Sequence, residues 1–309
     1  MATHISLVFP GQGSQNSEML DSFDQDTINL ISSISNNILP FDLVEIIKNG
    51  SPAELNKTSV TQPALLITSY FFFKKLICDL KIKVDICAGH SLGEYSALVA
   101  SDSIDIADAL NLVYQRGLLM EKSEKGIMCA ILGLDEQIIN KICSTISDKD
   151  SCSVSSANLN APKQIVIAGN EKGVIEAIKL CKEAGAKRCI ELKVTVPSHC
   201  NLMKEASDKF REKINEVKIN TPTIPLIQNY NAQISYDPIT IKENLINQLT
   251  NPVQWYKTMN SINKYNGIII ECGPGKVLSG LAKLNGANKI FSMSSLNFDE
   301  LKEFIWLKR

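Results

Sequence analysis

A short, largely apolar run, Val84–Ala88, leads directly into Gly89-His-Ser-Leu-Gly93, and residues 92–100 have the pattern of a helix. Such a run has the length and branched side chains of a buried parallel strand. A serine on the tight turn between a strand and a helix is a nucleophile elbow, because flanking glycines leave room for the strained turn and the approaching helix. Two glycines in an ordinary turn are the alternative, which the flanking patterns disfavour. The feature therefore predicts a parallel α/β sheet and covalent acyl chemistry at Ser91.

Composition narrows the class of protein. The 309 residues carry a formal net charge of −1, which gives no general attraction for nucleic acid or for an anionic membrane. The nine cysteines contain no Cys-x-x-Cys pair, so a zinc ribbon or a thioredoxin-like pair is not supported and reduced thiols are expected. The apolar runs at residues 5–9 and 64–73 are too short for a signal peptide and a membrane span, respectively. We expect a soluble, cytoplasmic protein.

The order of predicted strands and helices changes twice along the chain. Up to residue 125 they alternate as in a parallel α/β domain. Residues 126–197 follow the β-α-β-β-α-β order of a ferredoxin-like module, in which residues 158–162 are expected to form the turn between the two middle strands. We therefore predict a large α/β-hydrolase-like parallel-sheet domain, residues 1–125 and 198–309, with a small ferredoxin-like α+β domain, residues 126–197, inserted in it. The substrate cleft is expected at the seam between the two.

Three histidines are candidates for the base that takes the proton of Ser91. His4 precedes the first strand, and the side chain of His90 should diverge from its neighbour in the elbow. His199 lies in Val-Pro-Ser-His-Cys, where the chain returns to the large domain and borders the predicted cleft. A lone histidine is more often a surface or core residue, but elimination favours His199 as the general base.

Two backbone N–H groups are needed to stabilise the tetrahedral intermediate. One is the amide of Leu92, which follows the serine at the start of a helix. The loop Pro10–Gln15 follows the first strand and is the expected source of the second. Its glycines do not complete a dinucleotide-binding fingerprint, because residue 16 is asparagine. Residues 273–276, Gly-Pro-Gly-Lys, lack the ending of a phosphate-binding loop and are interpreted as a plain turn.

Arg116 is exceptional among the basic residues. The chain has 32 lysines and arginines, and this arginine lies in the apolar, helix-like stretch of residues 110–120. Burial of a guanidinium is costly, so its presence there indicates recognition of an anion by paired hydrogen bonds.

Eight longer sequence motifs, some of which contain the residues named above, occur along the chain. They are Phe9-Pro-Gly-Gln-Gly-Ser-Gln15, Thr61-Gln-Pro-Ala-Leu65, Gly89-His-Ser-Leu-Gly-Glu94, Gln115-Arg-Gly-Leu-Leu-Met120, Asn158-Leu-Asn-Ala-Pro162, Val196-Pro-Ser-His-Cys200, Asn251-Pro-Val-Gln-Trp255 and Gly273-Pro-Gly-Lys-Val-Leu278. In this order they resemble the bacterial malonyl-CoA:acyl-carrier-protein transacylases of fatty-acid synthesis, over essentially the whole chain.

The resemblance implies roles for the site residues. Ser91 would be the acylated nucleophile and His199 its base, which makes a dyad. Gln12 and Leu92 would supply the oxyanion amides, and Arg116 would contact the malonyl carboxylate. The backbone carbonyl of Gln248 would orient the histidine. Substrate binding would also involve His90, Asn158, Asn160 and Asn229. The family's usual Asn-Val-Asp-Ala is replaced by Asn-Tyr-Asn-Ala at residues 229–232. Any role that the aspartate has in the family is therefore not carried over to this chain.

The resemblance also implies a ping-pong reaction. Ser91 would take the malonyl group from malonyl-CoA and pass it to the phosphopantetheine thiol of holo acyl carrier protein, supplying extender units for fatty-acid biosynthesis or, alternatively, for a polyketide pathway. No metal or redox cofactor, nucleic-acid partner or membrane partner is expected, and a monomer is predicted. An α/β-hydrolase esterase is a rival, although no histidine follows residue 199. A non-catalytic carrier-binding module is a second rival, disfavoured by the intact serine and histidine.

Overall fold

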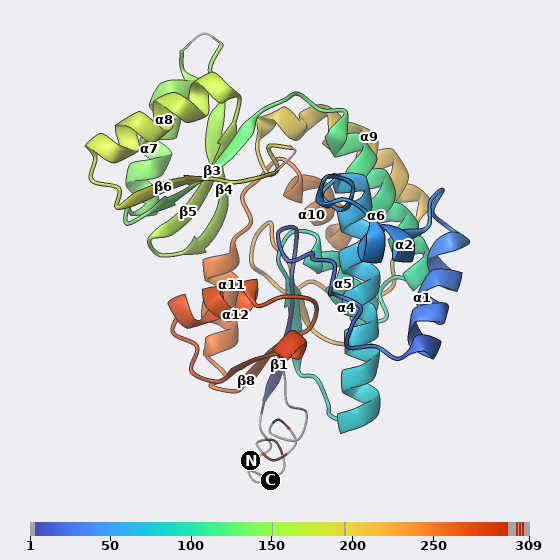
Figure 1. The fold of residues 1–309 in the computed structure, drawn as a ribbon. Helices are drawn as coiled ribbons and strands as arrows, with labels where there is room; N and C mark the ends of the chain where they lie inside the picture. Colours follow the sequence, from blue (N-terminus) through green and yellow to red (C-terminus); the bar gives the residue numbers. More distant parts are fainter. Residues whose placement is uncertain are drawn as a thin grey trace.

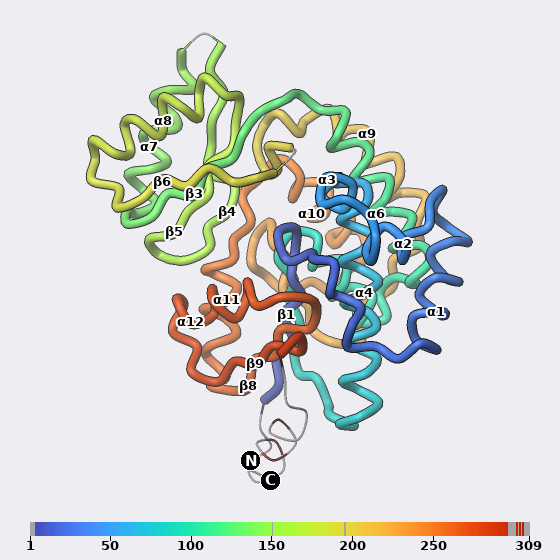
Figure 2. The backbone as a smooth tube through the Cα atoms, in the orientation of Figure 1, coloured from blue at the N-terminus to red at the C-terminus, as the bar shows by residue number. Residues whose placement is uncertain are grey.

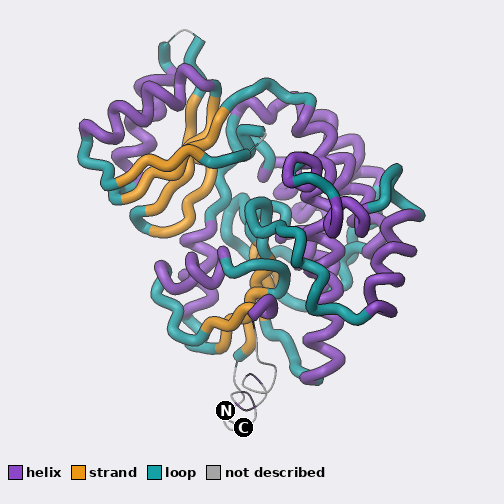
Figure 3. Tube along the Cα trace, viewed as in Figure 1, coloured by secondary structure: helices purple, strands orange, loops and turns teal. Residues whose placement is uncertain are grey.

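The structure, a computed structural model, describes residues 4–149, 151–194 and 196–295 together with residues 301, 303 and 305. Its strands form two separate sheets (Figure 3). The larger sheet has the order β7-β2-β1-β8-β9, and neighbouring strands are parallel throughout. Its strands are β1 (Ile5–Phe9), β2 (Ile86–Gly89), β7 (Leu226–Ile227), β8 (Ile268–Glu271) and β9 (Ile290–Ser292). The predicted parallel α/β sheet is confirmed.

Alternating side chains place this sheet between two helical layers. In β1, Leu7 and Phe9 join one buried cluster, whereas Val8 joins another on the opposite face, as the two-residue period of a strand requires. The first layer contains α4 (Thr58–Leu80), α5 (Gly93–Ala100), α6 (Ile106–Glu121) and α9 (Lys204–Glu216), and the second contains α11 (Trp255–Asn263) and α12 (Val277–Leu284) (Figure 1). The remaining helices of the larger lobe are α1 (Gln25–Asn36), α2 (Leu43–Asn49), α3 (Pro52–Leu55), α10 (Pro238–Gln248) and two 3₁₀ turns, η1 (Asn201–Met203) and η2 (Met293–Ser295).

The parallel pairing brings distant parts of the chain to one edge of the sheet. β1 at the start of the chain lies between β2 and β8, so the blue and red ends of the tube run side by side in Figure 2. Phe9 pairs with Gly89, and both strands end there. The loops that follow the two strands therefore open at the same sheet edge, which is where open α/β sheets hold their ligands.

The second sheet is antiparallel and has the order β4-β5-β3-β6. Its elements are β3 (Ile127–Leu132), α7 (Glu136–Ser147), β4 (Val154–Ala161), β5 (Gln164–Gly169), α8 (Glu171–Glu183) and β6 (Arg188–Glu191). Both helices cover the outer face of the sheet in the smaller lobe (Figure 1). The β-α-β-β-α-β order and the strand arrangement confirm the predicted ferredoxin-like module.

One local expectation was wrong. Asn158–Ala161 was expected to be a turn, but these residues belong to β4, because its backbone finds a second partner in Val253 and bends through two register shifts. Helix α4 begins at Thr58. At the start of this helix, the carboxylate of Glu121 in α6 accepts hydrogen bonds from the backbone amide and the hydroxyl of Ser59. It thereby satisfies an amide that has no partner within the helix.

Among the described residues, no helix combines the length and the apolar character that crossing a lipid bilayer would demand.

Candidate active site

Ser91 lies on the turn between β2 and α5 with a positive φ of 52°, a conformation that is strained for a residue other than glycine. The two flanking glycines permit this turn. A Cβ on Gly93 would lie 2.0 Å from the carbonyl oxygen of Phe9, and one on Gly89 would lie 1.9 Å from the carbonyl carbon of Gly93. The helix therefore approaches the sheet as closely as backbone allows, and the serine stands at the turn as the elbow pattern predicts.

His199 completes a dyad with the serine. Its Nε2 lies 2.7 Å from the Oγ of Ser91, and its Nδ1 lies 2.7 Å from the backbone oxygen of Gln248. A carbonyl oxygen only accepts, so Nδ1 carries the proton and Nε2 is free to accept the serine proton. Burial, reinforced by the positive charge of Arg116, lowers the pKa of His199 to about 3. The imidazole is therefore neutral near pH 7, as a general base must be.

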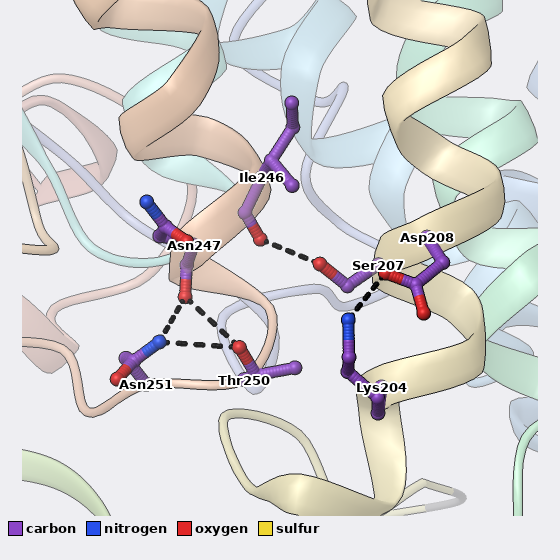
Figure 4. Close-up of polar contacts among 7 residues, drawn as sticks. All are labelled: Lys204, Ser207, Asp208, Ile246, Asn247, Thr250 and Asn251. Atoms are coloured by element: carbon purple, nitrogen blue, oxygen red, sulfur yellow. Dashed lines mark hydrogen bonds and ion pairs between the residues drawn. The ribbon is translucent and has the colours of Figure 1, made fainter.

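The end of α10 holds the carbonyl that orients the histidine. The last carbonyls of a helix have no partner within the helix. In Figure 4, the backbone oxygen of Ile246 accepts from Ser207 Oγ at 3.0 Å, and that of Asn247 accepts from Asn251 Nδ2 at 2.9 Å. The next carbonyl, that of Gln248, takes the proton on Nδ1 of the histidine. The side chains around this helix end thus fix the position of the carbonyl and, through it, the imidazole ring.

The side chain of Gln248 links the dyad to Arg116. Its Nε2 donates to the backbone oxygen of Ser91 at 3.1 Å and to Glu94 Oε2 at 2.7 Å. Its Oε1 accepts from Nη2 of Arg116 at 3.0 Å. Sequence reasoning assigned a role only to the backbone carbonyl of this glutamine.

Arg116 is fully buried in α6, with its guanidinium carbon 5.5 Å from the ring centre of Tyr95. Its Nε and Nη1 have no hydrogen-bond partner among the described residues. A buried guanidinium with unsatisfied N–H groups is costly, and such groups in folded proteins call for an explanation such as a missing ligand. The guanidinium is therefore suited to hold an anion, although it is not among the residues that line the cavity over the serine and histidine.

A cavity of about 80 Å³ opens over the serine and histidine. Its walls come from the loops at the edge of the parallel sheet and from the smaller, antiparallel sheet with the segment that leaves it. The residues that line it are Gln12, His90, Ser91, Met128, Asn158, Leu192, Val194, Val196, Ser198 and His199.

The predicted oxyanion donors lie at the expected sheet edge. Gln12 lines the cavity in the loop after β1, and Leu92 directly precedes α5. Neither backbone amide donates to another group among the described residues. Within the same residues, no group of three or more His, Cys, Asp or Glu side chains is placed to hold a metal ion.

The four predicted substrate-binding residues occupy different places. His90 and Asn158 line the cavity. Asn160 lies behind His90, with its Oδ1 2.8 Å from the Nε2 of that histidine. Asn229 is fully buried and does not line the cavity; its Oδ1 accepts from the amide of Ser91 at 2.6 Å. The geometry of Asn229 supports a role in holding the elbow.

The family of the chain follows from comparison with known proteins. Residues 6–283 match the family model described as an acyl transferase domain. The chain belongs to the acyl transferase family. The malonyl CoA-acyl carrier protein transacylase of Haemophilus influenzae is 40% identical over 312 residues, 97% of this chain and 98% of that protein. That of Escherichia coli strain K12 is 41% identical over 288 residues, 91% of this chain and 92% of that protein.

Solved structures agree with this acyl transferase in fold. FabD from Acinetobacter baumannii is 40% identical with a TM-score of 0.92, and all of both chains is covered. The malonyl-CoA:acyl carrier protein transacylase from Xanthomonas oryzae is 32% identical with a TM-score of 0.93, covering 98% of this chain and 99% of that one. A malonyl-transacylase solved in complex with a type II PKS acyl-carrier protein is 37% identical with a TM-score of 0.90, covering 95% and 97%.

Sequence reasoning missed Glu94 in this acyl transferase. The residue is fully buried in α5, where burial raises the pKa of its carboxyl to about 7 and several hydrogen bonds oppose the rise. A signal was present, because Glu94 lies between the elbow and the largely apolar stretch of residues 95–100, where a carboxylate is as unusual as the guanidinium of Arg116 in its apolar helix.

Proposed function

We propose that this acyl transferase is a malonyl-CoA:acyl carrier protein S-malonyltransferase that supplies malonyl units for fatty-acid biosynthesis. The observation that carries the proposal is a serine–histidine dyad beside a buried arginine that has unsatisfied N–H groups. Curated malonyl CoA-acyl carrier protein transacylases about 40% identical to this chain, and aligned over nearly its full length, support the same activity.

In the first half-reaction, Ser91 Oγ attacks the thioester carbonyl of malonyl-CoA while His199 Nε2 takes the hydroxyl proton. The amides of Gln12 and Leu92 stabilise the negative charge on the carbonyl oxygen. Collapse of the intermediate breaks the carbon–sulfur bond, and the leaving CoA sulfur receives the proton from His199. The products are malonyl-Ser91 and CoA.

In the second half-reaction, His199 takes the proton of the phosphopantetheine thiol of acyl carrier protein, and the sulfur attacks the acyl-serine. Ser91 then leaves with the proton, and the malonyl group has passed between two thiols with no net change in the enzyme. Support for the carrier protein as partner comes from a relative 37% identical to this chain that was solved with an acyl-carrier protein.

Arg116 selects the acyl group in this proposal. The free carboxylate of malonate accepts hydrogen bonds from the unsatisfied guanidinium nitrogens, whereas acetyl-CoA leaves them unpaired in a buried site. A site built to pair a substrate group rejects an analogue that lacks the group, because its own buried polar atoms stay unsatisfied. His90 and Asn158 contribute to the cavity wall that contacts the substrate, with Asn160 and Asn229 behind it.

Several further points belong to the same proposal. The catalytic domain comprises residues 1–125 and 198–309, of which 1–3, 296–300, 302, 304 and 306–309 lie outside the described residues. The inserted domain comprises residues 126–197, of which 150 and 195 lie outside them. The enzyme acts as a cytoplasmic monomer without metal or redox cofactor, nucleic acid or membrane partner. A polyketide pathway is the alternative destination of the malonyl group, since one similar structure contains a type II PKS carrier.

Intact-mass spectrometry after mixing the protein with malonyl-CoA tests the activity. We expect a malonyl adduct that Ser91→Ala abolishes and that holo acyl carrier protein removes with formation of malonyl carrier. Rapid release of free malonate would favour the hydrolase, and no adduct would favour a binding module. Apo carrier, which lacks the thiol, is the matched control for the second half-reaction.

A further inference from the structure

A buried carboxylate lies directly behind the dyad. Glu94 follows the elbow in α5, and none of its surface is exposed. Its Oε2 accepts from the amide of Asn229 at 3.1 Å and from Nε2 of Gln248 at 2.7 Å. Its Oε1 accepts from Nε2 of Gln228 at 3.4 Å. The carboxylate therefore contacts donors only, from the strand-end loop after β7 and from the end of α10.

The donors around Glu94 require both of its carboxylate oxygens to accept hydrogen bonds. The amide group of Gln228 is already oriented, because its Oε1 accepts from Asn244 Nδ2 at 2.6 Å. The amide of Asn229 belongs to the backbone and can only donate. Only the ionised carboxylate satisfies all three neighbours at once, because a protonated carboxyl would turn its own O–H toward one of these donors. Since the pKa of Glu94 is raised to about 7, this form predominates above that pH.

This arrangement determines which way the side-chain amide of Gln248 points. That amide has a donor end and an acceptor end that are nearly equal in shape. Two acceptors, the carboxylate of Glu94 and the backbone oxygen of Ser91, face its Nε2. The opposite end, Oε1, is thereby turned toward Nη2 of Arg116 at 3.0 Å. Reversing the amide would place its nitrogen against the guanidinium and its oxygen against two acceptors.

We propose that Glu94 is a positioning residue for acyl-group selection, which orients the Gln248 side chain so that Arg116 is held with its remaining N–H groups free for the substrate carboxylate. The inference rests on the proposed function for the identity of that carboxylate. Glu94 is not assigned a substrate contact, because both of its carboxylate oxygens already accept hydrogen bonds from the protein.

Glu94→Gln tests the proposal with the smallest change in shape. An amide in place of the carboxylate sets a donor against at least one of the donors around it and removes the negative charge. Gln248 Nε2 then keeps the backbone oxygen of Ser91 as its one acceptor that cannot reverse, and its orientation is less strongly enforced. Glu94→Asp keeps an acceptor-only group with shorter reach and is the conservative variant. Glu271→Gln is the matched control, because Glu271 is also a fully buried carboxylate that accepts backbone hydrogen bonds, at Leu278 and Ser279, but has no contact with Gln248.

Single-turnover acylation of Ser91 is measured for each variant with malonyl-CoA and with acetyl-CoA. We expect Glu94→Gln to lower the malonyl-to-acetyl ratio of kcat/KM by about tenfold or more, the size of one lost charged hydrogen bond, chiefly through a higher KM for malonyl-CoA. Glu94→Asp should restore most of the ratio, and Glu271→Gln should leave it unchanged. A merely structural role would lower both rates together, and an unchanged ratio in Glu94→Gln would overturn the proposal.

A second measurement separates this inference from the proposed function. Crystal structures of the wild type and Glu94→Gln show the contact between Arg116 and Gln248 whatever the substrate is. A lengthened or lost contact between Arg116 and Gln248 in the variant supports the inference, and a contact of unaltered length and geometry overturns it. Failure of the wild type to form malonyl-Ser91 would instead overturn the proposed function, while the crystal structures would still decide the role of Glu94.

Discussion

Replacing Arg116 by methionine is the most direct test of how this site selects its acyl group. Methionine fills much of the same buried space without charge or N–H groups, so the helix keeps its packing. A carboxylate that takes two hydrogen bonds from the guanidinium gains about 1.5–3 kcal/mol from each, or about 3–6 kcal/mol in all. The malonyl kcat/KM should therefore fall by a factor of about 10² to 10⁴.

Acetyl-CoA should respond in the opposite direction. It has no carboxylate, and in the wild type it leaves the free Nε and Nη1 of Arg116 unpaired in the occupied site. The methionine variant removes that penalty, so acetyl loading should hold steady or rise. Rates of Ser91 acylation by both thioesters, measured by intact mass under single-turnover conditions, give the discrimination directly.

Arg211→Met is the matched control, because Arg211 is exposed and paired with Glu243 on the surface. It should change neither rate, since exposed ion pairs contribute little. If the ratio of malonyl to acetyl loading in Arg116→Met equals that of the wild type, the assignment of the guanidinium to the substrate carboxylate is refuted.

Three other predictions concern the elbow and its base. The pKa of His199 lies at about 3, below its ordinary value, so the base stays unprotonated as pH falls and acetyl loading should hold from about pH 8 to about pH 5; a fall centred near pH 6.5 would contradict this. Asn229→Ala should lower the free energy of unfolding in urea by about 2–5 kcal/mol, because two buried backbone groups lose their partners, whereas Asn231→Ala on the exposed loop should leave it nearly unchanged. Gly93→Ala should cost about 3 kcal/mol or more in the same assay, since its Cβ would lie 2.0 Å from the Phe9 carbonyl oxygen; a stable variant would refute the close approach.

Much of the fold could be predicted because it follows from local patterns. The alternation of Leu7, Val8 and Phe9 between two buried faces is a property of any strand covered on both sides. The glycines of the elbow were equally informative, because the turn leaves no space for a side chain at either position. The prediction of a turn at Asn158–Ala161 was wrong because it depended on a contact that is not local. The backbone there pairs with Val253, a residue distant in sequence that a local pattern cannot reveal.

The sequence by itself identified the groups that we propose carry the chemistry: a serine on a strained turn, a single eligible histidine and a buried arginine. Histidine and arginine are scarce in this chain and the serine lies in an unusual turn, and such features can be recognised one segment at a time. Only the tertiary structure decided how they act together, because the contacts of Gln248 and Glu94 join segments more than one hundred residues apart. Hydrogen bonds between such distant segments have no local signature, so the orientation of the base and of the guanidinium emerges only when the chain is folded.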